Sequence, residues 1–175
     1  MTDTADFLVE IGTEELPPKS LVDLERAFAS QLQDGLKGAS LSFSTLRSFA
    51  TPRRLAVLVG GLQLEQPVRT IEKRGPPVSV AFNADGSPTR AAVAFAEGCG
   101  VAVEAVGRME TPKGAWLFHS ATAPGRPATE LLTGIVTAAL AALPIPRRMR
   151  WGSGEAEFVR PAHWIVMLLG NVVLD

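Results

Sequence analysis

The first forty residues combine one short apolar run with one amphipathic stretch. Residues 7–11 (Phe-Leu-Val-Glu-Ile) are typical of a strand, and Gly12-Thr13 closes it. Leucine and phenylalanine then recur at helical spacing between residues 21 and 32, before two glycines end the run. Pro17 and Pro18 suit the first turn of that helix. The pattern therefore predicts a strand, an acidic turn and an amphipathic helix.

Turn sequences separate three pairs of β-rich runs, which predicts three hairpins. The paired runs are residues 42–49 and 54–62, residues 106–110 and 115–121, and residues 164–169 and 172–174. A further strand over residues 68–73 ends at the basic sequence Lys-Arg-Gly-Pro-Pro. Because hairpins make antiparallel pairs, they disfavour a parallel, doubly wound fold.

Two more helices are expected in the second half of the chain. Ser87 is a good N-cap and Pro88 suits the first helical position of a helix that stops at Gly98. We predict an α/β fold of the α+β type: a mixed, mainly antiparallel sheet built from hairpins, with about three packed helices.

The strongest helical pattern runs over residues 129–143, with an unbroken apolar stripe. Its other face carries Thr133, Thr137 and Ala141 and is poor in charge. A face without charge is unusual for a solvated helix, so we expect another element or a partner to cover it.

Composition narrows the class of protein. Of 175 residues, 46% are hydrophobic and 20% are charged, as in an ordinary globular protein. The formal net charge is −1, so a nucleic-acid role would need a local basic patch. The single cysteine, Cys99, excludes an internal disulfide and makes a reducing, cytoplasmic compartment the expectation. The N-terminus is acidic, and no apolar run is long enough to span a bilayer, so no membrane partner is expected.

The organisation of the chain is less clearly marked. Two subdomains with a break near residues 75–87 fit the turn-rich sequence there. The last apolar strand stops after three residues at Asp175 with no polar tail. We therefore expect residues 1–175 to be part of a longer polypeptide that is truncated at 175.

Cations and tryptophans are concentrated between residues 144 and 164. Pro144 and Pro146 end the preceding helix, and four arginines then alternate with aromatic residues. Guanidinium groups beside flat rings suit phosphates and unstacked bases. The alternative is that Trp151 and Trp164 anchor a core while the arginines are solvated, and the sequence leaves both interpretations open.

Candidates for catalysis and metal binding are few. Glu14 and Glu15 lie near an expected helix N-terminus, where negative charge is favoured, although such a pair could also hold Mg²⁺ or an amine. With only His119 and His163, a histidine-based metal site is disfavoured. A small-molecule enzyme would need a pocket of convergent polar groups around either histidine. The sequence contains neither a Gly-x-Ser-x-Gly elbow nor a glycine-rich phosphate loop, so we name no catalytic residue and no metal ligand.

Six segments resemble the β subunit of bacterial heterotetrameric glycyl-tRNA synthetase, and they occur in that family's order. They are residues 8–18 (LVEIGTEELPP), 49–55 (FATPRRL), 73–76 (KRGP), 113–117 (KGAWL), 143–152 (LPIPRRMRWG) and 158–164 (FVRPAHW). The resemblance implies a cytoplasmic α2β2 ligase that joins glycine to its tRNA with ATP. It also implies that the α subunit carries the catalytic core and uses ATP and Mg²⁺, while the longer β subunit binds tRNA. This chain would be the N-terminal part of β, would bind no cofactor itself and would be inactive alone.

Two hypotheses about this region follow from the resemblance. In the first, basic groups position the tRNA backbone without reading bases. The candidate residues are Arg53, Arg54, Lys73, Arg74, Arg147, Arg148 and Arg150. The basic pairs at 53–54 and 73–74 are expected on turns, which could share one edge of the same sheet. In the second hypothesis, the region is a structural module that docks the α subunit and makes no RNA contact, and the arginines pair internally with carboxylates.

Overall fold

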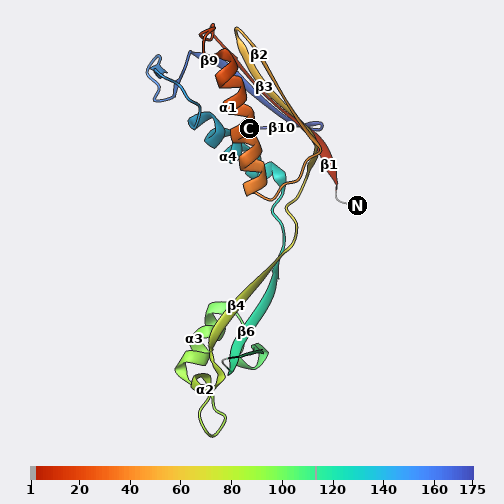
Figure 1. The fold of residues 1–175 in the computed structure, drawn as a ribbon, viewed down its shortest axis with the longest axis vertical. Helices are drawn as coiled ribbons and strands as arrows, with labels where there is room; N and C mark the ends of the chain where they lie inside the picture. Colours follow the sequence, from red (N-terminus) through yellow and green to blue (C-terminus); the bar gives the residue numbers. More distant parts are fainter. Residues whose placement is uncertain (1–2, 113) are drawn as a thin grey trace. The chain divides into compact units, whose positions relative to one another are not determined.

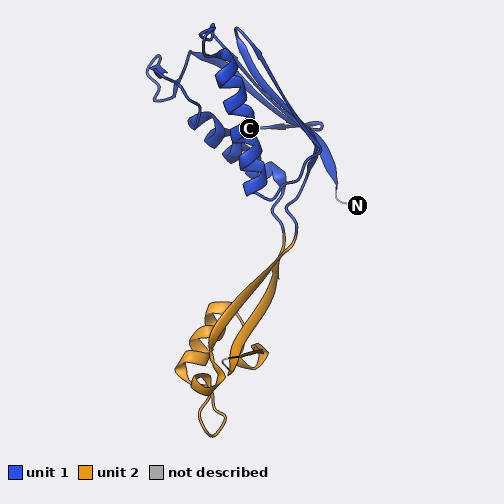
Figure 2. Ribbon diagram, in the orientation of Figure 1, with its two compact units in different colours: residues 1–67, 125–175 blue, residues 68–124 orange. Residues whose placement is uncertain are grey.

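The computed structural model describes residues 3–112 and 114–175. The chain forms two compact units, which Figure 2 shows in separate colours. Unit 1 comprises Met1–Pro67 and Gly125–Asp175, and unit 2 comprises Val68–Pro124. Unit 2 is therefore an insertion between two halves of unit 1. The sequence-based break near residues 75–87 stays a prediction.

Unit 1 is built on a five-stranded antiparallel sheet with the order β10-β9-β1-β3-β2 (Figure 1). Its strands are β1 (Thr4–Thr13), β2 (Thr45–Thr51), β3 (Arg54–Gln63), β9 (Ala162–Leu169) and β10 (Val172–Leu174). The central strand β1 places Val9 opposite Val57 on one side and Met167 on the other. The hairpins predicted for β2–β3 and β9–β10 are confirmed.

Two helices, α1 (Leu21–Gly38) and α4 (Ala128–Ala141), pack on the same face of this sheet. Their buried positions follow the apolar stripes of the sequence: Leu24, Phe28, Leu32 and Leu36 from α1, and Leu132, Val136 and Ala139 from α4. The helices approach closely, since a Cβ added at Gly35 would lie 2.6 Å from the Cγ2 atom of Ile135. Pro144 follows the end of α4, as predicted from the missing proline N–H.

The opposite face of the sheet is covered by no helix among the residues that the structure describes. Leu8 is half-buried there, between Leu58 and Leu168 on the neighbouring strands. Val166 and Val173 are exposed, with 37% and 69% of their surface accessible. A short hairpin of β7 (Met149–Arg150) and β8 (Glu157–Phe158) completes unit 1.

Unit 2 has a three-stranded antiparallel sheet with the order β4-β6-β5. Its elements are β4 (Arg69–Pro77), α2 (Val78–Ala81), α3 (Arg90–Cys99), the 3-10 helix η1 (Val103–Ala105), β5 (Gly107–Thr111) and β6 (Gly114–Ala123). Its buried cluster consists of Ala81, Ala92 and Leu117, with Phe82 and Phe95 packed against it. The predicted α+β class, with mainly antiparallel sheets and about three packed helices, is confirmed, and the four-residue α2 is an addition.

Three local predictions are wrong, and each error has a physical cause. Pro17 and Pro18 lie before α1, which begins only at Leu21, because the chain first makes a turn in which Ser20 N–H donates to the carbonyl of Pro17 at 2.9 Å. Thr89 precedes α3, whereas Ser87 forms a tight turn with the side chain of Asp85.

The third error concerns Lys73 and Arg74, which lie within β4 and not on a turn. The strand continues to Pro77 because β4 is an edge strand, where a missing proline N–H costs little. None of the described helices is long and apolar enough to cross a membrane.

Candidate functional site

Three segments that are distant in sequence meet at one end of the unit 1 sheet. The Thr13 N–H donates to the carbonyl of Arg53 at 2.9 Å, and the Leu16 N–H donates to Pro52 at 2.7 Å. The Glu14 N–H donates to the carbonyl of Pro161 at 3.0 Å. These backbone bonds join the end of β1 to the β2–β3 turn and to the start of β9, so the positions of the side chains here are set by the scaffold.

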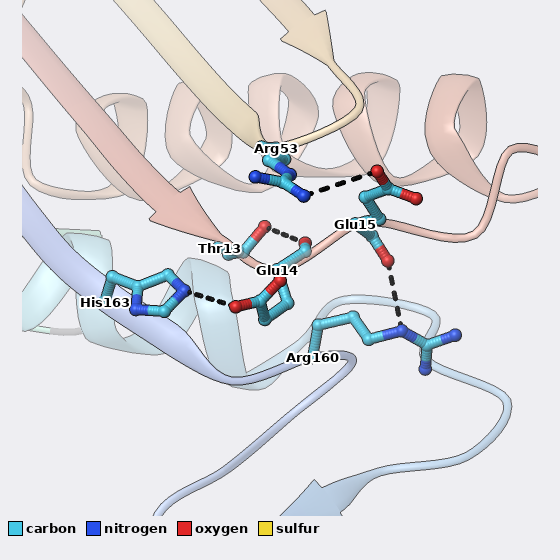
Figure 3. Close-up of polar contacts among 6 residues, drawn as sticks. All are labelled: Thr13, Glu14, Glu15, Arg53, Arg160 and His163. Carbon is cyan, nitrogen blue, oxygen red and sulfur yellow. Dashed lines mark hydrogen bonds and ion pairs between the residues drawn. The ribbon is translucent and has the colours of Figure 1, made fainter.

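The side chains at this junction form a mixed-charge cluster (Figure 3). An oxygen of Glu14 lies 3.0 Å from Nε2 of His163, and an oxygen of Glu15 lies 3.4 Å from a guanidinium nitrogen of Arg53. The Nε–H of Arg160 donates to the backbone carbonyl of Glu15 at 3.0 Å. At least half of each paired side chain is exposed, so each pair contributes no more than about 1 kcal/mol.

Arg54 extends this cluster onto the helix-free face of the sheet. Its guanidinium lies 3.3 Å from an oxygen of Glu10 and 5.7 Å from the ring centroid of Trp164. The ring of Trp164 lies against Gly12, where an added Cβ would overlap it. Gly12 is thus needed for the close approach of the indole, and the indole in turn supports the Arg54 side chain.

Two open clefts adjoin the cluster. The larger has a volume of about 740 Å³ and lies between the turn Glu14–Pro18, the Pro52-Arg53 turn and Arg160. The smaller, of about 250 Å³, lies between the end of β1, Arg53-Arg54 and His163-Trp164. The larger cleft presents guanidinium groups beside carboxylates, so it suits zwitterionic or hydrogen-bonding surfaces better than a single isolated charge.

The His163–Glu14 pair has the form of an oriented base but lacks a nucleophile. The nearest hydroxyl in sequence, that of Thr13, donates to the carbonyl of Glu14 at 2.8 Å. No hydroxyl or thiol of the described residues bonds to His163, so the arrangement does not form a catalytic triad. Within residues 3–112 and 114–175, no group of three or more metal-binding side chains occurs.

The arginines at 147, 148 and 150 lie together on the exposed segment that follows α4. Arg148 donates to the carbonyl of Ala141 at 2.6 Å, a bond that ties it to the C-terminal end of the helix. Arg150 lies opposite Glu157 in the β7–β8 pair. In the part of the chain that the structure describes, none of the three forms a side-chain ion pair.

The two tryptophans differ in role. Trp151 packs against the unit 1 core, whereas Trp164 is 39% exposed and lies under Arg54. The interpretation in which the tryptophans anchor a core therefore fits Trp151, whereas the interpretation in which a guanidinium lies beside an exposed ring fits Trp164.

The remaining candidates lie in unit 2. The Nζ of Lys73 donates to the carbonyl of Gly98 at 2.8 Å, near the end of α3. The guanidinium of Arg74 lies 4.7 Å from the ring centroid of Trp116. The sequence left open whether 53–54 and 73–74 share one sheet edge, and they do not, because the strands beside them belong to different sheets. His119 lies opposite Lys73 in the same unit.

Comparison with known proteins identifies the family of this chain. A family model described as the glycyl-tRNA synthetase beta subunit matches residues 7–175. The chain belongs to that family. Among its relatives, the glycine–tRNA ligase beta subunit of Hahella chejuensis is 54% identical over 170 residues, which are 97% of this chain. Those of Glaesserella parasuis and Haemophilus influenzae are each 52% identical over 172 residues, or 98% of this chain. The chain spans about a quarter of the length of these relatives.

Three of the six segments that resemble the glycyl-tRNA synthetase β family meet at the larger cleft: residues 8–18, 49–55 and 158–164. Arg160 lies in one of these segments but is not among the cations predicted from the sequence. Its role depends on a contact with Glu15, which is too distant in sequence to be inferred from spacing. The same holds for the pairing of Arg54 with Glu10.

Proposed function

We propose that this chain is the N-terminal part of the tRNA-binding β subunit of a cytoplasmic glycine–tRNA ligase with α2β2 assembly. In this proposal the ligase attaches glycine to its tRNA with ATP, and the α subunit provides catalysis and binds ATP and Mg²⁺. Support comes from the family match over residues 7–175 and from relatives whose names describe a glycine–tRNA ligase beta subunit. Incubated alone with glycine and ATP, the chain should release no pyrophosphate above a protein-free blank.

We further propose that the segment around β7 touches the tRNA backbone. The observation that supports this is the exposure of three neighbouring arginines, Arg147, Arg148 and Arg150, which no described carboxylate neutralises through an ion pair. Guanidinium groups free of carboxylate partners can displace counterions from phosphates. The other candidate cations of unit 1, Arg53 and Arg54, already face Glu15 and Glu10.

The experiment is a salt titration of tRNA binding to full-length β. Replacing Arg147, Arg148 and Arg150 with alanine should lower the slope of log K against log salt by about 2, because each lost phosphate contact removes roughly 0.7–0.9. The matched control replaces three exposed cations on or beside α1, namely Lys19, Arg26 and Lys37, and removes the same charge. Equal slopes in the two variants would contradict direct contact.

A second candidate function is a structural module that docks the α subunit. Two ion pairs favour it, Arg53 with Glu15 and Arg54 with Glu10, because guanidinium groups that already pair with carboxylates are less available to RNA. If docking is the role, β lacking residues 1–175 should fail to co-purify with α. An R53A/R54A double variant should then weaken the α–β complex more than it weakens tRNA binding.

A further inference from the structure

One edge of β9 is paired with another strand over only part of its length. The strand pairs with β1 over nearly its whole length, from Ala162 to Leu169. On its other side, β10 pairs only with Met167, Leu168 and Leu169. Among the described residues no strand lies along the outer edge of residues 162–166. A free strand edge presents backbone N–H and C=O groups that can bind a further strand.

An apolar groove of about 380 Å³ lies beside this free edge. Its walls include Leu140 and Ala141 from α4, Trp151 and Phe158 from the following segment, and Ile165 from β9. Ile165 is 50% exposed although its neighbour on β1, Ile11, is buried at 1%. Since a cavity of about 150 Å³ can hold one benzene, the groove has room for more than one apolar side chain.

The uncharged face of α4, which carries Thr133, Thr137 and Ala141, also borders this groove. Thr137 and Ala141 line the groove, and the hydroxyl of Thr133 donates to the carbonyl of Asp175 at 2.8 Å. These three residues follow one another at four-residue spacing along the helix. The end of β10 therefore lies at one end of this face, and the groove lies further along it.

The register of β10 determines where a continuing chain would go. Val173 lies opposite Leu168, and Leu174 lies opposite Met167. If the strand continued, the first residue after Asp175 would lie opposite Ile165. Because side chains alternate between faces, that residue would project to the helix side of the sheet, next to the groove.

We propose that in the full-length β subunit the residues directly after Asp175 extend β10 along the free edge of β9, with apolar side chains in the groove. This rests on the proposed N-terminal position of the chain in β. The relatives are about four times as long as the matched part, so such subunits have ample further chain. The extension would cover Ile165 and the Thr133, Thr137 and Ala141 face of α4 with one segment.

Disulfide trapping in full-length β tests the register. Ile165→Cys is combined with cysteine at the first residue after Asp175, in a background without other cysteines. Directly opposite residues have Cα atoms about 4.5–5.5 Å apart, within the range of disulfides, so mild oxidation should cross-link most of the protein within one chain. Val166→Cys with the same partner should cross-link at least tenfold less, because its side chain points to the other face.

Leu168→Cys with Val173→Cys is the positive control, since this pair is already opposed. If the control forms and the test pair does not, the proposal is wrong. Cross-linking between two chains would show that a second copy occupies the edge and would also overturn it.

Hydrogen exchange gives an independent measurement. The amide of Ile165, which points to the free edge, should exchange slowly in β alone, and proline at the first and third residues after Asp175 should speed its exchange at least tenfold, whereas the amides of Trp164 and Val166 point to β1 and should stay protected. Slow exchange only after the α subunit is added would identify α as the occupant and contradict the proposal. Neither assay needs tRNA or activity, so a failure of tRNA binding would count against the proposed function and leave this strand extension standing.

Discussion

Units 1 and 2 have the same kind of antiparallel sheet with helices, but they differ in how much core the sheet and helices share. In unit 1 the buried cluster continues from α1 and α4 into three of the five strands, β1, β3 and β9. In unit 2 it consists of Ala81, Ala92 and Leu117. Because burial of apolar area is the main favourable term in folding, unit 1 should be the stable framework and unit 2 the weaker insertion.

This difference bears on how each unit presents its cations. Arg53 and Arg54 are attached to a turn that backbone bonds hold against a large core. Lys73 and Arg74 lie on an edge strand whose unit buries few side chains. Opening of part of a protein costs least where few apolar contacts are lost. Lys73 and Arg74 of unit 2 should therefore be more mobile than Arg53 and Arg54 of unit 1.

The largest effect is expected from the core of unit 1. Leu32 is 0% exposed in the middle of α1, so Leu32→Ala should lower the free energy of unfolding by about 2–5 kcal/mol. Denaturant unfolding followed by circular dichroism measures the change. Val22→Ala on the same helix, at a site that is 49% exposed, should change it by less than about 0.5 kcal/mol. Similar losses in both variants would show that the core does not dominate.

A somewhat smaller effect is expected in unit 2. Leu117 is the largest side chain of its buried cluster, and Leu117→Ala should cost that unit about 2–3 kcal/mol, because a small core can partly collapse around the cavity. Hydrogen exchange should then rise in residues 69–123 and stay unchanged in α1 and β1. The control is Val80→Ala, at a site that is 57% exposed. An equal rise in both units would contradict separate unfolding.

Local sequence patterns predicted most elements of both units. The β2–β3 hairpin follows from the turn residues between two β-rich runs, and α4 follows from its apolar stripe. Such features depend on residues within a few positions of each other. The position of β4 in a separate sheet from β2 and β3 was not predictable, because strand pairing depends on contacts between distant segments.

The same distinction applies to the candidate site. The candidate cations are exposed as expected, although Lys73 and Arg74 are exposed on an edge strand and not on a turn. Their partners were not predictable: Arg54 meets Glu10 and Trp164 across strands, and Arg160 meets Glu15 across most of the chain. Spacing in sequence carries no information on these pairs, since tertiary folding alone brings them together.

Each unit places one arginine over one tryptophan, which allows a direct comparison at smaller energies. The guanidinium of Arg74 lies 4.7 Å from the Trp116 ring, whereas that of Arg54 lies 5.7 Å from Trp164 and also pairs with Glu10. In each double-mutant cycle the arginine is replaced by alanine and the tryptophan by leucine. The coupling energy between the two side chains should be about 0.5–1 kcal/mol in unit 2 and less than about 0.5 kcal/mol in unit 1. Unfolding of each unit, followed by hydrogen exchange, measures both cycles. A larger coupling in unit 1 would show that Glu10 strengthens the stacking.

The smallest effect concerns an exposed carboxylate of unit 2. The side-chain hydroxyl of Ser87 donates to Asp85 at 2.6 Å and its backbone N–H donates at 2.9 Å, and these bonds lower the pKa of Asp85 below its ordinary value of 3.8. A lowered folded-state pKa means that the contribution to stability is present above pH 3.8 and is lost as the pH falls through the folded-state value. Unit 2 should thus lose this contribution in acid, whereas Asp85→Asn should remove that part of the pH dependence.

Titration of the Asp85 carboxyl carbon by NMR checks this directly. The midpoint should lie below 3.8 in the native chain and move upwards in Ser87→Ala, which removes the hydroxyl but keeps the backbone donor. Because the backbone bond remains, the midpoint in Ser87→Ala should still fall short of 3.8. A native midpoint at or above 3.8 would mean that the turn does not hold the carboxylate in solution, and that the N-terminal approach to α3 is looser than the rest of unit 2.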